Sequence, residues 1–293
     1  MHNIVQAIIL GLLTGGVYAL MASGQTLIFG IMKVINLAQG ALVILAAYLS
    51  YTLFTAFGID PFLSILITTP VLFGVGVLIQ LGFLRPLRSD EASRLSILVT
   101  FAVALGIEGV LSVSYSTTYR AIQPPYANSS FSVAGYQISA VRLYAFGLSV
   151  VLLGALYLLL RHSRFGRSVR ATVQNPTAAK LLGVNTTRIA ALGFGLGAAT
   201  AAASGAVYGT VYSFNSGSHY DLISRLLSIV ILGGLGSMPG AVLAALIMGV
   251  VPALVAELGA PIWSDFSFFA VLLLVLLIRP RGLLGPALRD ART

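Results

Sequence analysis

Long apolar stretches without a single charged residue constrain this chain more than any other feature. One runs from residue 143 to 160, between Arg142 and Arg161, and another runs from 61 to 84. A helix that spans a bilayer needs about 20 mostly apolar residues, so both stretches have the required length. Lipid offers no hydrogen-bond partner for bare backbone N–H and C=O groups, and such stretches must therefore be helical.

The composition extends this conclusion to the whole chain of 293 residues. Hydrophobic residues make up 58% of the chain and charged residues only 9%, whereas about a quarter of the residues in a soluble domain are charged. We therefore predict an all-α, polytopic helical membrane protein with roughly eight transmembrane segments. Residues 1–293 are expected to form a single transmembrane domain.

Charged residues, glycine and proline divide the chain into these segments. The expected crossings are residues 4–21, 38–57, 62–84, 95–114, 143–160, 189–208, 226–256 and 264–278. As one helix, the stretch 226–256 would be about 46 Å long, which exceeds a bilayer core of about 30 Å. Gly233, Gly234, Gly236 and Pro239 interrupt it. We predict that it forms two arms joined at this break, as a broken hairpin.

Basic residues determine the expected orientation. The net charge is +9, but the basic residues lie at segment ends and are not interleaved with aromatic residues, so we expect no nucleic-acid partner. Most of them lie in segments 85–94, 161–188 and 279–292, which share one side if the N-terminus faces outside. We predict that this side is cytoplasmic and that it includes the C-terminus. Three arginines oppose the rule: Arg120, Arg142 and Arg225.

The longest basic segment, 161–188, contains the signals of a short helix. Asn175 is a good N-cap, Pro176 suits the first helical position, and Gly183 suits the position after the end. These signals predict a helix over residues 176–182. An isolated helix of two turns is marginal in water, so its apolar face requires either the bilayer surface or another protein. That apolar face consists of Ala178, Leu181 and Leu182.

Nothing in the sequence indicates catalysis or a bound metal. A Walker loop for nucleotide binding needs G-x-x-x-x-G-K-[ST], yet the two lysines, Lys33 and Lys180, follow Met32 and Ala179. The absence of cysteine excludes disulfides, iron–sulfur clusters and thiolate zinc sites, and the three histidines are far apart in the sequence. We therefore expect no catalytic residue, no metal site and no cofactor bound by this chain.

Polar and glycine residues within the apolar segments are candidates for a translocation path. Two of them flank a glycine-rich break near residues 24–30, where they either line the path or bind exposed backbone. A carboxylate within a crossing is costly, and it either has a function or packs against a polar partner. Glycines at the break of the seventh segment bring backbone close either to substrate or to another helix. The candidates are Asn36, Gln39, Glu108, Gly233, Gly234 and Gly236. Asp221 and Arg225 are four residues apart and are expected to pair on the outer side.

The chain resembles the permeases of the branched-chain amino acid ABC importers, the LivH-type subunit. The residues that carry the resemblance follow in order along nearly the whole chain: 15–24 (GGVYALMASG), 28–40 (IFGIMKVINLAQG), 164–167 (RFGR), 174–176 (QNP), 181–183 (LLG), 232–237 (LGGLGS), 239–240 (PG) and 279–283 (RPRGL). One departure is Gln39, where relatives often have histidine.

The resemblance implies a function and a set of partners. The chain would be a permease in the bacterial inner membrane that forms a path for branched-chain or related amino acids. Its partners would be a second, LivM-type permease, two ABC ATPase subunits that hydrolyse ATP, and a periplasmic substrate-binding protein. The short cytoplasmic helix would be the coupling helix that docks on the ATPase. Its residues are Asn175, Pro176, Thr177, Ala178, Ala179, Lys180, Leu181, Leu182 and Gly183.

Two other classes remain as alternatives. An ion-coupled secondary transporter or facilitator for a small polar solute would explain the apolar bundle and the broken segments, but not the capped cytoplasmic helix. A membrane-embedded enzyme would need paired carboxylates or a histidine-rich cluster at membrane depth. The eight acidic residues are scattered at segment ends and do not provide one.

Overall fold

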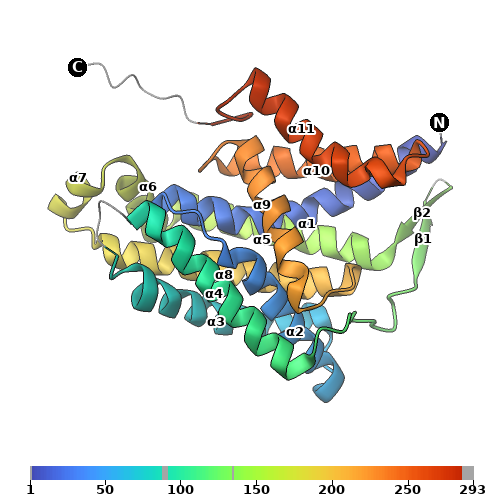
Figure 1. Cartoon of the computed structure of the whole chain (residues 1–293), viewed down its shortest axis with the longest axis horizontal. Helices are drawn as coiled ribbons and strands as arrows, with labels where there is room; N and C mark the ends of the chain where they lie inside the picture. Colours follow the sequence, from blue (N-terminus) through green and yellow to red (C-terminus); the bar gives the residue numbers. More distant parts are fainter. Residues whose placement is uncertain (1, 88–91, 134, 286–293) are drawn as a thin grey trace.

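The computed structural model describes residues 2–87, 92–133 and 135–285. Within these ranges, eight helices are long and apolar enough to cross a membrane. This confirms the predicted polytopic helical architecture, with one small addition. The connection between α4 (Ala92–Tyr115) and α5 (Ala140–His162) carries a two-stranded antiparallel hairpin of β1 (Ser130–Val133) and β2 (Tyr136–Ser139) (Figure 1).

The helices follow one another along the chain with short connections. They are α1 (His2–Met32), α2 (Ala38–Phe57), α3 (Pro61–Ile79) continued by the π-helical turn η1 (Gln80–Leu84), α4 (Ala92–Tyr115), α5 (Ala140–His162), α6 (Arg164–Gln174), α7 (Pro176–Leu181), α8 (Thr186–Val211), the 3-10 turn η2 (Ser216–Ser218), α9 (His219–Gly233), α10 (Met238–Glu257), the 3-10 turn η3 (Pro261–Trp263) and α11 (Ser264–Ile278).

The first helix departs most from the predicted boundaries. The sequence predicts an end before the glycine-rich stretch 24–30, but α1 continues through it to Met32, and the break follows at 33–37. Glycine in this helix serves close packing. A Cβ atom at Gly24 would lie 2.7 Å from the carbonyl oxygen of Gly197, so α8 approaches only because no side chain is present.

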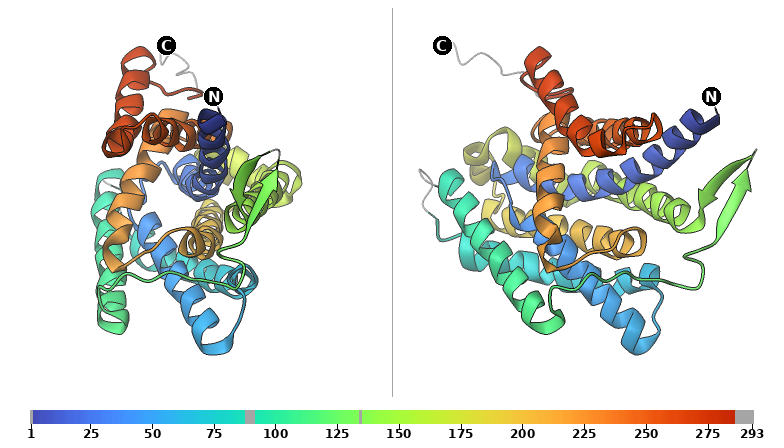
Figure 2. Two further views of the ribbon diagram at one scale, coloured as in Figure 1. Left: turned by 90° about the vertical axis from the view of Figure 1, so that its right-hand side faces the viewer. Right: turned by 45° about the vertical axis from the view of Figure 1, so that its right-hand side comes forward.

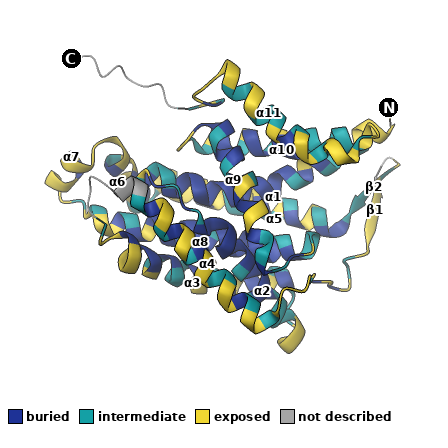
Figure 3. Cartoon of the chain, in the orientation of Figure 1, coloured by how far each residue is buried: buried dark blue, intermediate teal, exposed yellow. Residues whose placement is uncertain are grey.

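The centre of the bundle is built from α8 and its neighbours. In α8, 78% of the spanning stretch is buried, compared with 6% in the last spanning segment, which contains α11. α8 consists largely of glycine and alanine, and α1, α2 and α3 all pack against it. Small residues allow this because lipid supplies no hydrophobic force between helices, so close contact must hold them together. The exposed apolar residues cover the outer faces of α3, α4, α5 and α11 (Figure 3).

The charge-free stretch 226–256 is broken as predicted. α9 ends at Gly233 and α10 begins at Met238, with Gly234 at φ 99° and Gly236 at φ 82° in the turn between them. Positive φ at both positions favours glycine. α9 runs across the direction of α10 (Figures 1 and 2).

The bundle has two chemically different ends. The described parts of the basic segments, 85–87, 92–94, 161–188 and 279–285, lie at one end, which we call the basic end. There, one cavity is lined by residues of η1, α6, α7 and α8, and the backbone after α11 bonds to the end of α9. The N-terminus and the strand pair lie at the other end, the hairpin end, where His2 stacks on Tyr136 (Figure 2). Residues 88–91 and 286–293 of the basic segments lie outside the described residues.

Candidate functional site

The helix α7 has the caps that the sequence predicts. The side-chain oxygen of Asn175 accepts a hydrogen bond from the backbone N–H of Ala178 at 3.0 Å, and Pro176 occupies the first turn. Gly183 lies beyond the end with φ 83°. The helix ends at Leu181, one residue earlier than predicted, because Leu182 already has non-helical backbone angles.

The apolar face of α7 points away from the protein. Leu181 and Leu182 are 85% and 82% exposed, whereas Ala179 on the opposite side is 2% exposed. α7 forms the tip of the basic end (Figures 1 and 3). Two large apolar side chains therefore stand free at a tip whose backbone is fixed by caps on both sides.

A second helix in this segment, α6, was not predicted. Ser163 caps it by accepting a hydrogen bond from the N–H of Gly166 at 2.9 Å. Phe165 and Val169 face inward and pack in a cluster with Leu27 of α1 and residues of α5 and α8. Ser163 followed by apolar residues four apart is a signal that could have revealed this helix, but the surrounding arginines obscured it.

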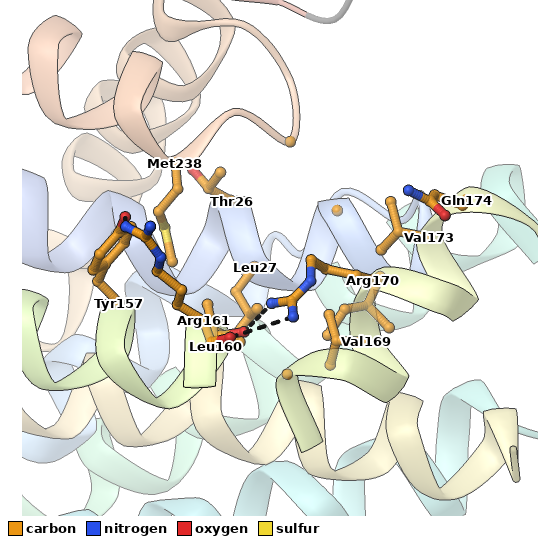
Figure 4. A pocket seen from close by; sticks show the side chains of 14 residues that line it. Thr26, Leu27, Tyr157, Leu160, Arg161, Val169, Arg170, Val173, Gln174 and Met238 are labelled. Carbon is orange, nitrogen blue, oxygen red and sulfur yellow. Dashed lines mark hydrogen bonds between the residues drawn. The ribbon is translucent and has the colours of Figure 1, made fainter. Parts of the chain in front are cut away.

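The outer face of α6 is strongly basic. It carries three exposed arginines at three-residue intervals: Arg164, Arg167 and Arg170. Arg170 donates to the carbonyl oxygens of Leu160 and Arg161 at the end of α5 (Figure 4). These bonds satisfy orphan carbonyls of that helix end, and they fasten α6 to α5.

A cavity of 510 Å³ lies beside α6, between this helix and the α9–α10 turn. Its walls come from α1, α5, α6 and the turn before α10, and they are mostly apolar (Figure 4). Gly30 of α1 and Gly236 of the turn both line it. The cavity leaves space between α6 and the α9–α10 turn.

Asn36 and Gln39 bind exposed backbone at the break after α1. Asn36 accepts from the N–H of Ala38 at 3.1 Å and donates to Gln39 at 3.3 Å, and Gln39 donates to the carbonyl of Gly197 in α8 at 3.1 Å. Gln25, oriented so that both its polar atoms are paired, bonds to the N–H and C=O of Asn36 at 3.2 and 3.1 Å. This is one of the two predicted roles, and it satisfies backbone that lipid could not.

Glu108 has polar partners from a distant part of the chain. The hydroxyl of Tyr220 donates to its carboxylate at 2.9 Å, and the Nε2 atom of His219 lies 3.8 Å from the same carboxylate oxygen. His219 is buried, and its Nδ1 atom bonds to the carbonyl of Ser216 at 3.0 Å. Because that carbonyl accepts, Nδ1 carries a proton, and Nε2 is left facing Glu108.

The three candidate glycines meet backbone. A Cβ atom at Gly233 would lie 2.5 Å from the backbone nitrogen of Ala241, and one at Gly234 would lie 2.5 Å from the Cα atom of Gly285. A Cβ atom at Gly236 would lie 3.6 Å from the Cα atom of Gly30, which is an ordinary van der Waals contact. The six path candidates therefore occupy three places: the break after α1, the contact of α4 with α9, and the α9–α10 turn. Their part in translocation stays a prediction.

The predicted pair of Asp221 and Arg225 forms, and it includes a third member. Arg225 donates to Asp221 and to Asp265 of α11, both at 2.8 Å. Local spacing reveals the first partner, but Asp265 lies 40 residues further along the chain. The guanidinium group of Arg225 also lies over the ring of Phe268, 5.4 Å from the ring centroid.

Comparison with known proteins agrees with this architecture over nearly the whole chain. Residues 7–276 match the family described as branched-chain amino acid transport system / permease component. The chain is 30% identical to the high-affinity branched-chain amino acid transport system permease protein BraD of Pseudomonas aeruginosa, covering 97% of this chain and 96% of the relative. It is 31% identical to LivH of Escherichia coli, covering 94% and 93%. It is 29% identical to a probable LivH of Methanocaldococcus jannaschii, covering 91% and 88%. No solved structure matches. The chain thus belongs to the family of permease components of branched-chain amino acid transport systems.

Proposed function

We propose that this chain is the permease subunit of an ATP-binding cassette importer for branched-chain amino acids in the bacterial inner membrane. Residues 1–293 act as one permease domain beside a second, LivM-type permease. Two ATPase subunits hydrolyse ATP on behalf of the chain. A periplasmic binding protein delivers the substrate.

The observation that carries this proposal is the exposed leucine pair at the tip of α7. Burial of a leucine side chain contributes about 1.5–3 kcal/mol, so Leu181 and Leu182 together supply a strong anchor for a protein groove. The basic end faces the cytoplasm in this proposal because lysine and arginine concentrate there, and the N-terminus then faces outside.

Movement of α7 reaches the membrane helices through α6. The bonds from Arg170 hold α6 to the end of α5, and Phe165 and Val169 connect it to α1 and α8. A displacement of the ATPase therefore tilts α6 against the α9–α10 turn, with the 510 Å³ cavity as the space for movement. Alternation between outward-open and inward-open states follows if ATP binding favours one of them.

Leu181→Asp tests the docking role. A carboxylate placed in an apolar groove loses the burial of leucine and must be desolvated, so the affinity for the ATPase should fall at least about 100-fold. The measurement is co-purification of the ATPase from membranes. Leu258→Asp, at an exposed leucine on the hairpin end, serves as the control. Retention of the ATPase at the normal ratio in Leu181→Asp would refute the proposal.

An ion-coupled transporter is the second candidate, and one observation favours it. The buried imidazole of His219 lies 3.8 Å from the carboxylate of Glu108 on another helix. Uptake in vesicles with ATP but without any ion gradient distinguishes the two candidates. The ATP-binding cassette importer works under these conditions, and the ion-coupled transporter does not.

A further inference from the structure

A second cavity lies at the opposite end of α8 from the coupling segment. It has a volume of 330 Å³, within the range of about 300–1,000 Å³ that small-molecule sites occupy. It is formed by the last turns of α8, the first turns of α9, the second half of α10, the start of α11 and the middle of α1. α8 begins beside α7, so its 26 residues place this cavity about 39 Å from the basic end.

Charged groups line one side of this cavity. Arg225 is held between Asp221 and Asp265, and all three line the wall. One positive and two negative charges leave the group formally anionic. Arg225 donates to the carboxylates through Nε and one terminal nitrogen, so its other terminal nitrogen keeps its donors for a ligand.

Three tyrosines add to the polar part of the lining. Tyr18 lies in α1, Tyr208 in α8 and Tyr212 at the C-cap position just after α8, and none of their hydroxyls has a hydrogen-bond partner among the described residues. Tyr18 is only 8% exposed, and buried tyrosine hydroxyls normally find a partner. An unpartnered hydroxyl, carried by a buried tyrosine and open to a cavity, therefore points to a polar ligand.

Apart from Thr14 and Ser264, the rest of the lining has no polar side chain. Leu222, Met248, Pro252 and Ala253 form this part of the wall, and Leu222 and Met248 are fully buried. The carboxylates and aromatic rings of the cavity can bind an ammonium group. Its guanidinium group and hydroxyls can bind a carboxylate, and its apolar surface can accommodate a short apolar side chain.

We propose that this cavity is a station for the zwitterionic amino acid on its way through the permease. The ammonium group of the substrate lies against Asp221 and Asp265, its carboxylate takes hydrogen bonds from Arg225 and Tyr18, and its side chain packs on Met248. The proposal deepens the proposed function and rests on it. Since Arg225 is already shared by two carboxylates, the station binds weakly, which suits a site that must release its substrate.

Equilibrium binding of radiolabelled leucine to the purified transporter, without the binding protein, tests the site directly. Unlabelled leucine should compete, whereas leucinamide and 4-methylpentanoate, which each lack one charged group, should compete at least about tenfold less well. Tyr18→Phe should weaken binding about tenfold, the loss expected for one hydrogen bond to a charged group. Asp265→Asn, at the exposed rim, should weaken binding without endangering the fold. Tyr144→Phe is the control, because Tyr144 is exposed and is not part of this wall.

Uptake by the reconstituted transporter separates this inference from the proposed function. If wild-type proteoliposomes take up leucine with ATP and Tyr18→Phe and Asp265→Asn do so equally well, the station is wrong and the permease function stands. If the wild type takes up no leucine, the proposed function fails. Whatever the uptake result, the station is overturned if leucinamide competes as well as leucine. It is also overturned if the purified wild-type transporter binds no radiolabelled leucine.

Discussion

The neighbouring helices α7 and α8 are built on opposite principles. α8 is rich in glycine and alanine and lies at the centre, where its backbone touches the helices around it. α7 has six residues and ends beside two leucines with no contact on their outer side. In the membrane, small side chains stabilise the fold because they let backbones approach. In water, large apolar side chains left uncovered mark a surface for a partner. Stability and function should therefore separate on mutation.

Gly205→Leu should have the largest effect. A Cβ atom at Gly205 would lie 2.6 Å from the Cβ atom of Ala46 and 2.9 Å from the backbone nitrogen of Ala47. A leucine there must push α2 away, and we expect a loss of at least about 3 kcal/mol and little folded protein. Size-exclusion chromatography of the solubilised protein measures the yield of folded permease. Gly109→Leu, on an exposed face with nothing within 4 Å, should fold normally. Equal yields of the two variants would contradict the central role of α8.

The double change Leu181→Ala and Leu182→Ala should leave the fold intact and weaken assembly. Each truncation removes about 1.5–3 kcal/mol of burial in the proposed complex, so ATPase affinity should fall by at least about 100-fold. The thermal unfolding temperature of the permease alone should stay unchanged, because both side chains are exposed. If the double variant unfolds at a lower temperature but still assembles normally with the ATPase, α7 contributes to stability and not to partner binding, which contradicts the contrast with α8.

Gln39→Leu should give an intermediate loss of stability. It removes the hydrogen bonds that fasten the break after α1 to α8 and leaves Asn36 and the carbonyl of Gly197 without this partner. The expected cost is about 1–3 kcal/mol. Gln123→Leu, in an exposed loop, is the matched control. If Gln39→Leu unfolds at the same temperature as wild type but transports poorly, Gln39 acts on the path and not on the backbone.

Asn175→Ala should have the smallest effect. Loss of the cap on α7 costs about 1 kcal/mol, and only α7 frays. We expect ATP-driven uptake to fall several-fold while ATPase assembly survives at high protein concentration. Asn175→Asp keeps the capping oxygen and should restore uptake. Failure of that rescue would show that the side chain does something other than cap the helix.

The elements that the sequence predicts well depend on local signals. α2 and α11 agree with their predicted bounds because charge-free stretches end at turn residues, such as Gly58 and Asp60. The caps of α7 were likewise predicted from local sequence signals. α1 was predicted too short because glycine usually interrupts helices in water, whereas inside a bilayer it allows close contact with α8.

The remaining errors concern contacts between distant segments. The sequence around Glu108 contains no signal that His219 and Tyr220 will contact it. The sequence around Arg225 likewise contains no signal that Asp265 will pair with it. The cavity with Tyr18 depends on five helices that meet only in the fold. Spacing along one helix predicts partners three or four residues apart, but it contains no information about which helices become neighbours.

Labelling of a single cysteine tests the central claim most directly. The chain contains no cysteine, so Leu181→Cys introduces a unique target at the tip of α7. A membrane-impermeant maleimide should leave it unmodified in intact cells and should modify it in inside-out vesicles. Assembly with the ATPase should then protect it. Modification from outside the cell, or equal modification with and without the ATPase, would contradict the assignment of α7 as the helix that links the motor to the permease.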